Sequence, residues 1–309
     1  MKFCIIGNTN NPVTGVKNQP YSWFCKTFID GLLHNGHSPL LIDYKSSTLD
    51  QIKNTLLHHK IAHVFTHLTF HGKKNLDQEL NMYQEVTKKL GTKFIHTVGD
   101  ARTHDRYMGD VSHAIHLGLV GTHPLVENCA PVWKIPVMYM PYSSLTYKEM
   151  GTYQKNLDFG MPVFTGSNSH EDRKKFIKGI QKRMNIKIIG TQSGQDLRNE
   201  TLNLSASSVI LGLCTKYEIS GYMDVRPFQY LGAGACMIMR KFKGMDDFIP
   251  DDLYYSFDSY DNPAIVSDYW NEIQNIDTHP MRKKAFEYIQ QNHSSKVRIK
   301  QILNILKEL

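Results

Sequence analysis

The chain has 309 residues, 41% of them hydrophobic and 21% charged, which is typical of a soluble globular protein with room for two domains of about 150 residues each. No apolar run is long enough to span a bilayer, so the sequence predicts no membrane span. The net charge of +7, spread along the chain, favours a polyanionic partner or a phosphorylated substrate, although solubility alone would also explain it. Five scattered cysteines without a CxxC pair predict reduced, mostly buried thiols and a cytoplasmic location.

The first half of the chain alternates short apolar runs with amphipathic stretches. Strands are predicted at residues 3–6, 39–43, 62–70, 93–97, 116–121 and 137–139, and helices at 21–33, 49–58 and 76–90. This order predicts a parallel sheet with right-handed crossovers, that is, a Rossmann-like domain. No GxGxxG motif follows the first strand, so the dinucleotide fingerprint is absent.

The alternation restarts after a polar stretch, 145–158, that we interpret as an interdomain linker. Strands are predicted at 162–165, 187–189, 207–213, 236–239 and 253–257, helices at 172–184 and 225–231, and helical structure from 263 to the end with breaks near His279 and Asn292. The sequence thus predicts an α/β protein with two Rossmann-like domains, 1–150 and 151–309, which face each other across a cleft, and a helical C-terminus. Ligands of such sheets bind at the carboxyl ends of the strands.

Several residues suited to phosphate binding follow strands of the second domain. Gly166 and Ser167 end one strand, Arg173 lies in the helix after it, Gly190 ends the next strand, and Arg226 opens a later helix. Glycine allows close backbone approach, while the serine hydroxyl, helix N–H groups and a guanidinium can bind an oxyanion. Each feature alone is also explained as an ordinary turn or a surface arginine, so the prediction of a phosphate or diphosphate site depends on their joint placement.

These motifs resemble those of the GT-B glycosyltransferases, in particular the CgeB-like group and the T-even phage DNA β-glucosyltransferase. Residues 163–173, VFTGSNSHEDR, are similar to a Gly-Ser…Arg phosphate loop, and 187–190, KIIG, to the strand after it. Residues 226–238, RPFQYLGAGACMI, are similar to an Arg-x-x-Glu…Gly signature whose Arg binds the donor diphosphate and whose Glu binds the ribose. Gln229 replaces that Glu, a neutral acceptor in place of a charged one. The resemblance implies a donor-binding set made of Gly166, Ser167, Arg173, Gly190, Tyr222, Arg226 and Gln229.

The first domain should then bind the acceptor and supply any catalytic base. The sequence VGDAR at 98–102 follows a strand and is similar to an Asp-x-Arg of the phage enzyme, which implies that Asp100 is the general base and Arg102 a supporting contact. Asp100 as a simple helix cap is the alternative. The loop 8–22 contains no Asp or Glu, unlike the corresponding loop of that enzyme, so inverting and retaining chemistry both stay open.

Histidines crowd the first domain, at positions 63, 67, 71, 96, 104, 113, 116 and 123. No HExxH or Cys/His spacing indicates a metal, so a histidine that orients the acceptor is the better interpretation than a metal ligand. We therefore expect a nucleotide-sugar donor, UDP-sugar first, and no required metal or other cofactor. Nothing in the sequence defines the oligomeric state.

The acceptor is predicted from charge and resemblance together. Lys73, Lys74, Arg106 and Tyr107 could form a basic and aromatic acceptor surface, suited to double-stranded DNA with one base flipped out. A hydroxymethylated DNA base, in the host cytoplasm if a phage encodes the chain, is the leading acceptor. A cell-surface glycan or protein acceptor, or a non-catalytic nucleotide-sugar or DNA-binding module, are the alternatives.

Overall fold

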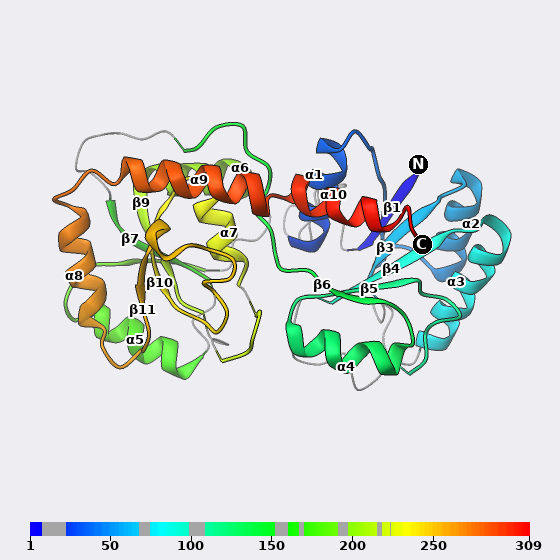
Figure 1. Ribbon diagram of the computed structural model, residues 1–309, viewed down its shortest axis with the longest axis horizontal. Coiled ribbons are helices and arrows are strands. Elements are labelled where there is room, and N and C mark those ends of the chain that lie inside the picture. Colours follow the sequence, from blue (N-terminus) through cyan, green and yellow to red (C-terminus); the bar gives the residue numbers. More distant parts are fainter. Residues whose placement is uncertain are drawn as a thin grey trace. The chain divides into compact units, whose positions relative to one another are not determined.

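Figure 1 shows the computed structural model of the chain, which describes residues 1–7, 23–67, 75–98, 109–151, 160–166, 170–190, 197–214, 218–222 and 224–309. The chain folds into two compact units. Unit 1 comprises Met1–Pro141 together with Ser295–Leu309, and unit 2 comprises Tyr142–Ser294. Both are parallel α/β units, as the alternating sequence pattern predicts.

Unit 1 is built on a six-stranded parallel sheet in the order β2-β1-β3-β4-β5-β6. Its elements are β1 (Phe3–Gly7), α1 (Trp23–His34), β2 (Leu40–Asp43), α2 (Leu49–His59), β3 (His63–Thr66), α3 (Leu76–Leu90), β4 (Lys93–Val98), β5 (Leu117–Val120), α4 (His123–Trp133), β6 (Val137–Tyr139) and, from the chain end, α10 (Ser295–Ile305). Every predicted strand and helix of this half is present, and α4 is an addition.

The four central strands of unit 1, β1, β3, β4 and β5, are buried on both faces, which explains why they read as continuous hydrophobic runs. In β1, Cys4 and Ile6 pack in the cluster formed with α2, α3 and α4, whereas Phe3 and Ile5 pack in the cluster formed with α1 and α10. Alternate side chains of β1 therefore pack in two different hydrophobic clusters, one on each face of the sheet.

Unit 2 is built on a five-stranded parallel sheet in the order β11-β10-β9-β7-β8. Its elements are β7 (Gly160–Thr165), α5 (Glu171–Gln181), β8 (Lys187–Ile189), α6 (Leu197–Ser207), β9 (Ser208–Gly212), α7 (Val225–Leu231), β10 (Cys236–Arg240), the 3-10 helix η2 (Asp251–Leu253), β11 (Tyr255–Phe257), α8 (Ala264–Ile273) and α9 (His279–His293). Met237 and Met239 of β10 pack with α7 and α9, and Cys236 and Ile238 with α5 and α8. The predicted breaks near His279 and Asn292 fall where α9 begins and ends.

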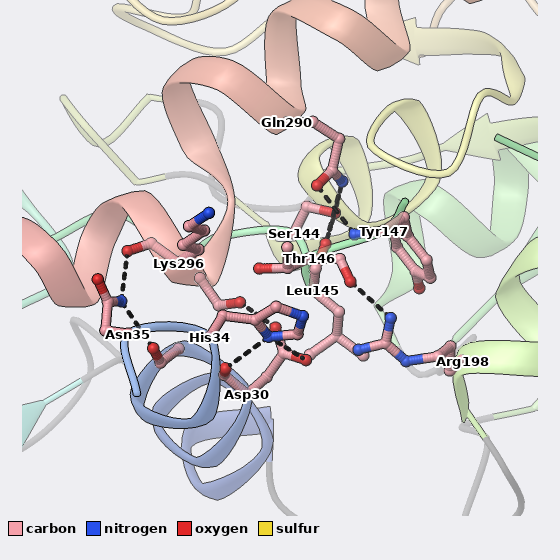
Figure 2. A network of polar contacts seen from close by, with 12 residues as sticks. Asp30, His34, Asn35, Ser144, Leu145, Thr146, Tyr147, Arg198, Gln290 and Lys296 are labelled. Atoms are coloured by element: carbon pink, nitrogen blue, oxygen red, sulfur yellow. Dashed lines mark hydrogen bonds and ion pairs between the residues drawn. The ribbon is translucent and has the colours of Figure 1, made fainter. Parts of the chain in front are cut away.

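The units divide the chain differently from the predicted 1–150 and 151–309. The last helix, α10, packs on α1 of unit 1, where a Cβ on Gly31 would lie 2.2 Å from Cγ1 of Ile299. The two helices approach so closely only because Gly31 has no side chain. Ser295 Oγ donates to the Asp30 carboxylate, and Asn35 Nδ2 donates to the carbonyl of Lys296 at 2.9 Å (Figure 2).

The start of the predicted linker belongs to unit 2. Gln290 of α9 accepts from the N–H of Tyr147 at 2.9 Å and donates to the carbonyl of Leu145 at 3.0 Å (Figure 2). Arg198 of α6 donates to the carbonyl of Thr146 at 2.5 Å, and its guanidinium lies 5.0 Å from the centre of the Tyr147 ring. Side chains of α6 and α9 therefore hold residues 145–147 in place. The sequence of this segment is polar and has no hydrophobic period, so these contacts could not be predicted from it.

Two further predictions can be compared with the described residues. All five cysteines are free thiols and buried, in agreement with the sequence prediction. Among the described residues, no helix is both long and apolar enough to cross a membrane.

Candidate functional site

Three arginines gather at the carboxyl edge of the unit 2 sheet, where ligands of parallel sheets bind. Arg226 lies in the first turn of α7, Arg173 in the first turn of α5, and Arg240 ends β10. The guanidinium groups of Arg226 and Arg173 lie 5.9 and 5.4 Å from the centre of one ring, that of Phe164 in β7. The edge thus concentrates positive charge over a single aromatic residue.

Gly166 is required for this arrangement. Its φ of +133° lies in a region that L side chains rarely adopt, and a Cβ there would lie 2.0 Å from Nη2 of Arg226. The Gly166 N–H donates to the carbonyl of Ile189 at 2.9 Å, so the end of β7 is tied to the end of β8. The group that approaches Gly166 in the structure is the Arg226 guanidinium, and the predicted contact of Gly166 with a phosphate stays a prediction.

The structure fixes the orientation of Arg226 from two sides. Its Nε donates to the carbonyl of Thr165 at 2.5 Å, and its Nη1 pairs with the carboxylate of Asp224. Asp224 is also the N-cap of α7 and accepts from the Arg226 N–H at 3.3 Å. The Arg226 side chain is 19% exposed, with Nη2 directed at Gly166.

The start of α7 itself offers fewer donors than the sequence suggests. The orphan N–H of Arg226 is used by Asp224, and Pro227 has no N–H to offer. In this segment the side chain of Arg226, rather than the helix N-terminus, therefore has more N–H groups to offer an anion.

Arg173 is a buried cation next to another cation. It is only 5% exposed, and its Nη1 donates to the carbonyl of Leu213 at 3.2 Å. Its Nε has no hydrogen-bond partner among the described residues. Burial lowers the pKa of Arg173, and the nearby charge of Arg226 lowers it further. A bound anion would relieve both effects, because it would attract two cations that now repel each other.

Arg240 and Tyr260 were not predicted as site residues. The Arg240 guanidinium lies 4.0 Å from the centre of the Tyr260 ring, and the Tyr260 hydroxyl donates to the carbonyl of Cys214 at 2.6 Å. Burial raises the pKa of Tyr260, which keeps this donor protonated. An arginine that ends a continuous apolar strand is the sequence signal that could have identified Arg240.

Two hollows open at this edge, and Arg240 lines both. The smaller, of about 10 Å³, has room for about one water molecule and is lined by Gly212, Cys214, Asp224, Arg226, Pro227, Met239, Arg240 and Phe242. The larger, of about 260 Å³, is lined by Asp172, Lys175, Arg240, Ser259, Tyr260 and Asp261. Of the three arginines, Arg240 lines the hollow with room for more than a water molecule, whereas Arg226 lines the small one.

The other residues that we predicted to bind the nucleotide-sugar donor, where the structure describes them, differ in their surroundings. Gln229 is 6% exposed, and its Nε2 donates to Oγ1 of Thr201 in α6 at 2.7 Å. Tyr222 packs against the core cluster that contains α7 and α9, and its N–H donates to the carbonyl of Ile219 at 3.1 Å. Gly190 is exposed, with open space where a Cβ would lie. The structure brings Gly166, Arg173 and Arg226 together, whereas Gln229 faces α6.

The other predicted site residues lie outside the described residues, namely Ser167, Asp100, Arg102, Lys73, Lys74, Arg106 and Tyr107. Their roles therefore stay predictions.

The carboxyl edge of the unit 1 sheet holds a different group of polar side chains. Glu79 of α3 is 1% exposed and accepts from the Tyr83 hydroxyl at 2.7 Å, which in turn lies 3.2 Å from Oγ1 of Thr66 at the end of β3. Burial raises the pKa of Tyr83, and the Glu79 charge raises it further. The ring of His67 lies 5.4 Å from that of His96. Within the described ranges, no group of three His, Cys, Asp or Glu side chains could hold a metal ion.

Comparisons with known proteins identify the fold. Neither a family model nor a curated protein matches the sequence. A glycosyltransferase from Rickettsia africae has a TM-score of 0.60 at 13% identity over 99% of this chain and 98% of that chain. Anabaena Alr3699/HepE in complex with UDP-glucose has a TM-score of 0.59 at 8% identity, with all of both chains covered. T4 phage BGT in complex with its UDP-glucose substrate has a TM-score of 0.56 at 16% identity over 100% and 99%. The chain has the GT-B glycosyltransferase fold, as the motifs predicted.

Proposed function

We propose that the protein is a glycosyltransferase that moves a sugar from a nucleotide-sugar donor, UDP-sugar first, to an acceptor hydroxyl. The observation that carries this proposal is Arg226, held by Thr165 and Asp224 with Nη2 against Gly166 at the carboxyl edge of unit 2. Two structural neighbours contain UDP-glucose, which supports a donor of this class.

The diphosphate of the donor would bind at the Arg226 and Arg173 guanidinium groups. As the bond from the anomeric carbon to the phosphate oxygen breaks, negative charge grows on the leaving diphosphate. Guanidinium groups that are already oriented stabilise that charge without reorganisation in the transition state. The Asp224 carboxylate orients Arg226 and takes up part of its charge, so Nη2 is the atom we assign to the ligand.

For the acceptor we propose the hydroxymethyl group of a base in DNA, and this step rests on the resemblance to the phage enzyme and on the net charge. Asp100 would take the proton of the attacking hydroxyl, with Arg102 beside it and with Lys73, Lys74, Arg106 and Tyr107 as acceptor contacts. If the chemistry is retaining, the departing phosphate can take that proton instead.

Donor binding and turnover test the proposal in one set of assays. Thermal unfolding with UDP-, GDP- and ADP-sugars should give the largest rise in melting temperature with the correct donor, because a ligand that binds only the folded state stabilises it. That donor should then be hydrolysed or transferred to hydroxymethylated duplex DNA. Stabilisation without any turnover would indicate a non-catalytic binding module, and transfer to a glycan or protein would replace the DNA acceptor.

A further inference from the structure

The net positive charge is not spread along the chain, as we first expected, because one short segment carries most of it. Residues 171–187, which contain α5 and the turn to β8, hold seven lysines and arginines but only two carboxylates. This segment alone therefore contributes five of the seven net positive charges of the chain. Of its seven cations only Arg173 is buried, and it belongs to the site described above.

The other six cations form an exposed surface that we call the α5 basic face, namely Lys174, Lys175, Lys178, Lys182, Arg183 and Lys187. Lys174, Lys178 and Lys182 follow one another at intervals of four residues and so lie along one side of the helix. The opposite side of α5, with Phe176, Ile177 and Ile180, is buried in the core.

Within the described residues of unit 2, no ion pair neutralises this face, although Lys175 lines one hollow together with Asp172 and Asp261. None of its six side chains has an ion pair or a side-chain hydrogen bond with a described residue. The neighbouring helix α8 carries two exposed carboxylates, Asp268 and Glu272, and Glu272 accepts from Tyr255 instead. Cations in a row without ion pairs repel one another, and an external polyanion that binds them lowers this repulsion.

We propose that the α5 basic face binds the phosphate backbone of double-stranded DNA and so holds the polymer acceptor on unit 2. From Lys174 to Lys182 the row spans about 12 Å, which exceeds the reach of a single diphosphate. Duplex DNA carries a charge every 1.7 Å or so along its axis, so several phosphates can meet the row together.

The side-chain types favour DNA backbone over two other ligands. Five of the six are lysines, which act as point charges and position a backbone without reading its bases. An anionic membrane would also attract them, but surface helices that bind membranes need exposed apolar residues to insert. The apolar residues of α5 are buried in the core instead.

The test compares two triple variants of the full chain with equal loss of charge. K174Q/K178Q/K182Q removes the row, and K88Q/K148Q/K243Q removes three exposed lysines elsewhere. Binding to an unmodified 20-bp duplex is measured by fluorescence anisotropy over a range of salt concentrations, without donor. We expect the first variant to weaken binding about tenfold or more and to lower the slope of log K against log salt by about 2 to 3, and the second to change little.

The inference shares the DNA acceptor with the proposed function, but the two can fail separately. UDP-glucose binding by calorimetry is measured on the same proteins. Donor binding without any effect of K174Q/K178Q/K182Q on DNA affinity would overturn the inference and leave the donor site intact. Equal weakening by both triple variants, or row-dependent binding to phosphatidylserine vesicles in place of DNA, would also overturn it. DNA binding through the row by a protein that binds no nucleotide sugar would sustain the inference and contradict the proposed function.

Discussion

The two units have the same parallel α/β architecture, but the polar side chains at the carboxyl edges of their sheets are of different types. The edge of unit 2 carries the guanidinium cations of Arg173, Arg226 and Arg240. The edge of unit 1 carries the buried Glu79–Tyr83–Thr66 chain and two histidines, groups that hold or exchange protons. The sequence has the same division, because six of nine arginines lie in unit 2 and twelve of fifteen histidines in unit 1.

This difference suggests a division of labour. A fixed positive charge suits an anionic donor, whose diphosphate must be bound before and during bond breaking. Neutral and titratable groups suit an acceptor hydroxyl, which must be oriented and deprotonated. The predictions below test the two edges separately.

The largest effect is expected for Arg226→Ala on donor turnover. Loss of a preorganised charge contact should raise the barrier by about 2–4 kcal/mol, or roughly 30- to 1,000-fold in kcat/KM. Donor hydrolysis assayed with UDP-glucose checks this. Lys243→Ala, which removes an exposed charge elsewhere, is the control and should keep full activity. Near-normal activity of Arg226→Ala would remove the basis of the donor site.

On the unit 1 side, Asp100→Asn should reduce turnover by about 100-fold or more, because the shape is kept and the proton acceptor is lost. Donor affinity, measured by calorimetry, should hardly change, since we propose that the donor binds at unit 2. Asp110→Asn, which alters an exposed carboxylate paired with Lys134, serves as the control. Full turnover of Asp100→Asn would place the base elsewhere and favour retaining chemistry.

A pair of glycine variants sharpens the account of Gly166. Gly166→Ala places a methyl group where Nη2 of Arg226 lies and strains a backbone with φ of +133°, whereas Gly190→Ala meets open space. We expect the first variant to weaken UDP binding about tenfold and to lower the free energy of unfolding by roughly 1–3 kcal/mol. The second should leave both quantities unchanged. Calorimetry and urea denaturation measure them, and equal behaviour of the two variants would contradict the geometry.

The smallest effect concerns the histidines of unit 1 and pH. Burial lowers the pKa of His116 from 6.5 to about 4, and burial also lowers that of His63. Between pH 4 and 6.5 the unfolded chain therefore binds more protons than the folded protein. The contribution of neutral His116 to the free energy of unfolding is complete above pH 6.5 and is lost as the pH falls toward 4. His116→Gln should reduce the loss of unfolding free energy between pH 7.5 and 5 by an amount on the order of 1 kcal/mol. The exposed His58→Gln variant serves as the matched control.

Much of the fold could be predicted because the buried strands and periodic helices have strong signals. Helices α3 and α7 and strand β6 have the predicted bounds. Helix α4 was missed because Pro124 and Pro131 look like helix breakers, yet Pro124 occupies the first turn, where a missing N–H is harmless. Helix α6 was missed because its Asn, Thr and Ser residues have weak helix propensity and its packing on β9 and α7 is not visible in the sequence.

The site was harder to predict than the fold, because residue type does not reveal surroundings. Arg282 and Arg173 are both buried arginines. The first is part of the core of unit 2 and donates to the carbonyls of Gly234 and Ser205, at 2.7 and 2.8 Å, whereas the second lies at the sheet edge. Gly166 was predicted as a phosphate contact, which stays a prediction, whereas the sequence did not indicate that the missing side chain of Gly166 makes room for Arg226.

The most direct test of the central claim is to compare UDP with uridine in wild-type protein and in Arg226→Ala by calorimetry. The account predicts that wild-type protein binds UDP at least about tenfold more tightly than uridine, the ratio expected for one charge-assisted contact, and that Arg226→Ala loses most of this ratio while uridine affinity stays the same. A ratio that is unchanged in Arg226→Ala would show that the diphosphate does not bind at Arg226 and would contradict the account.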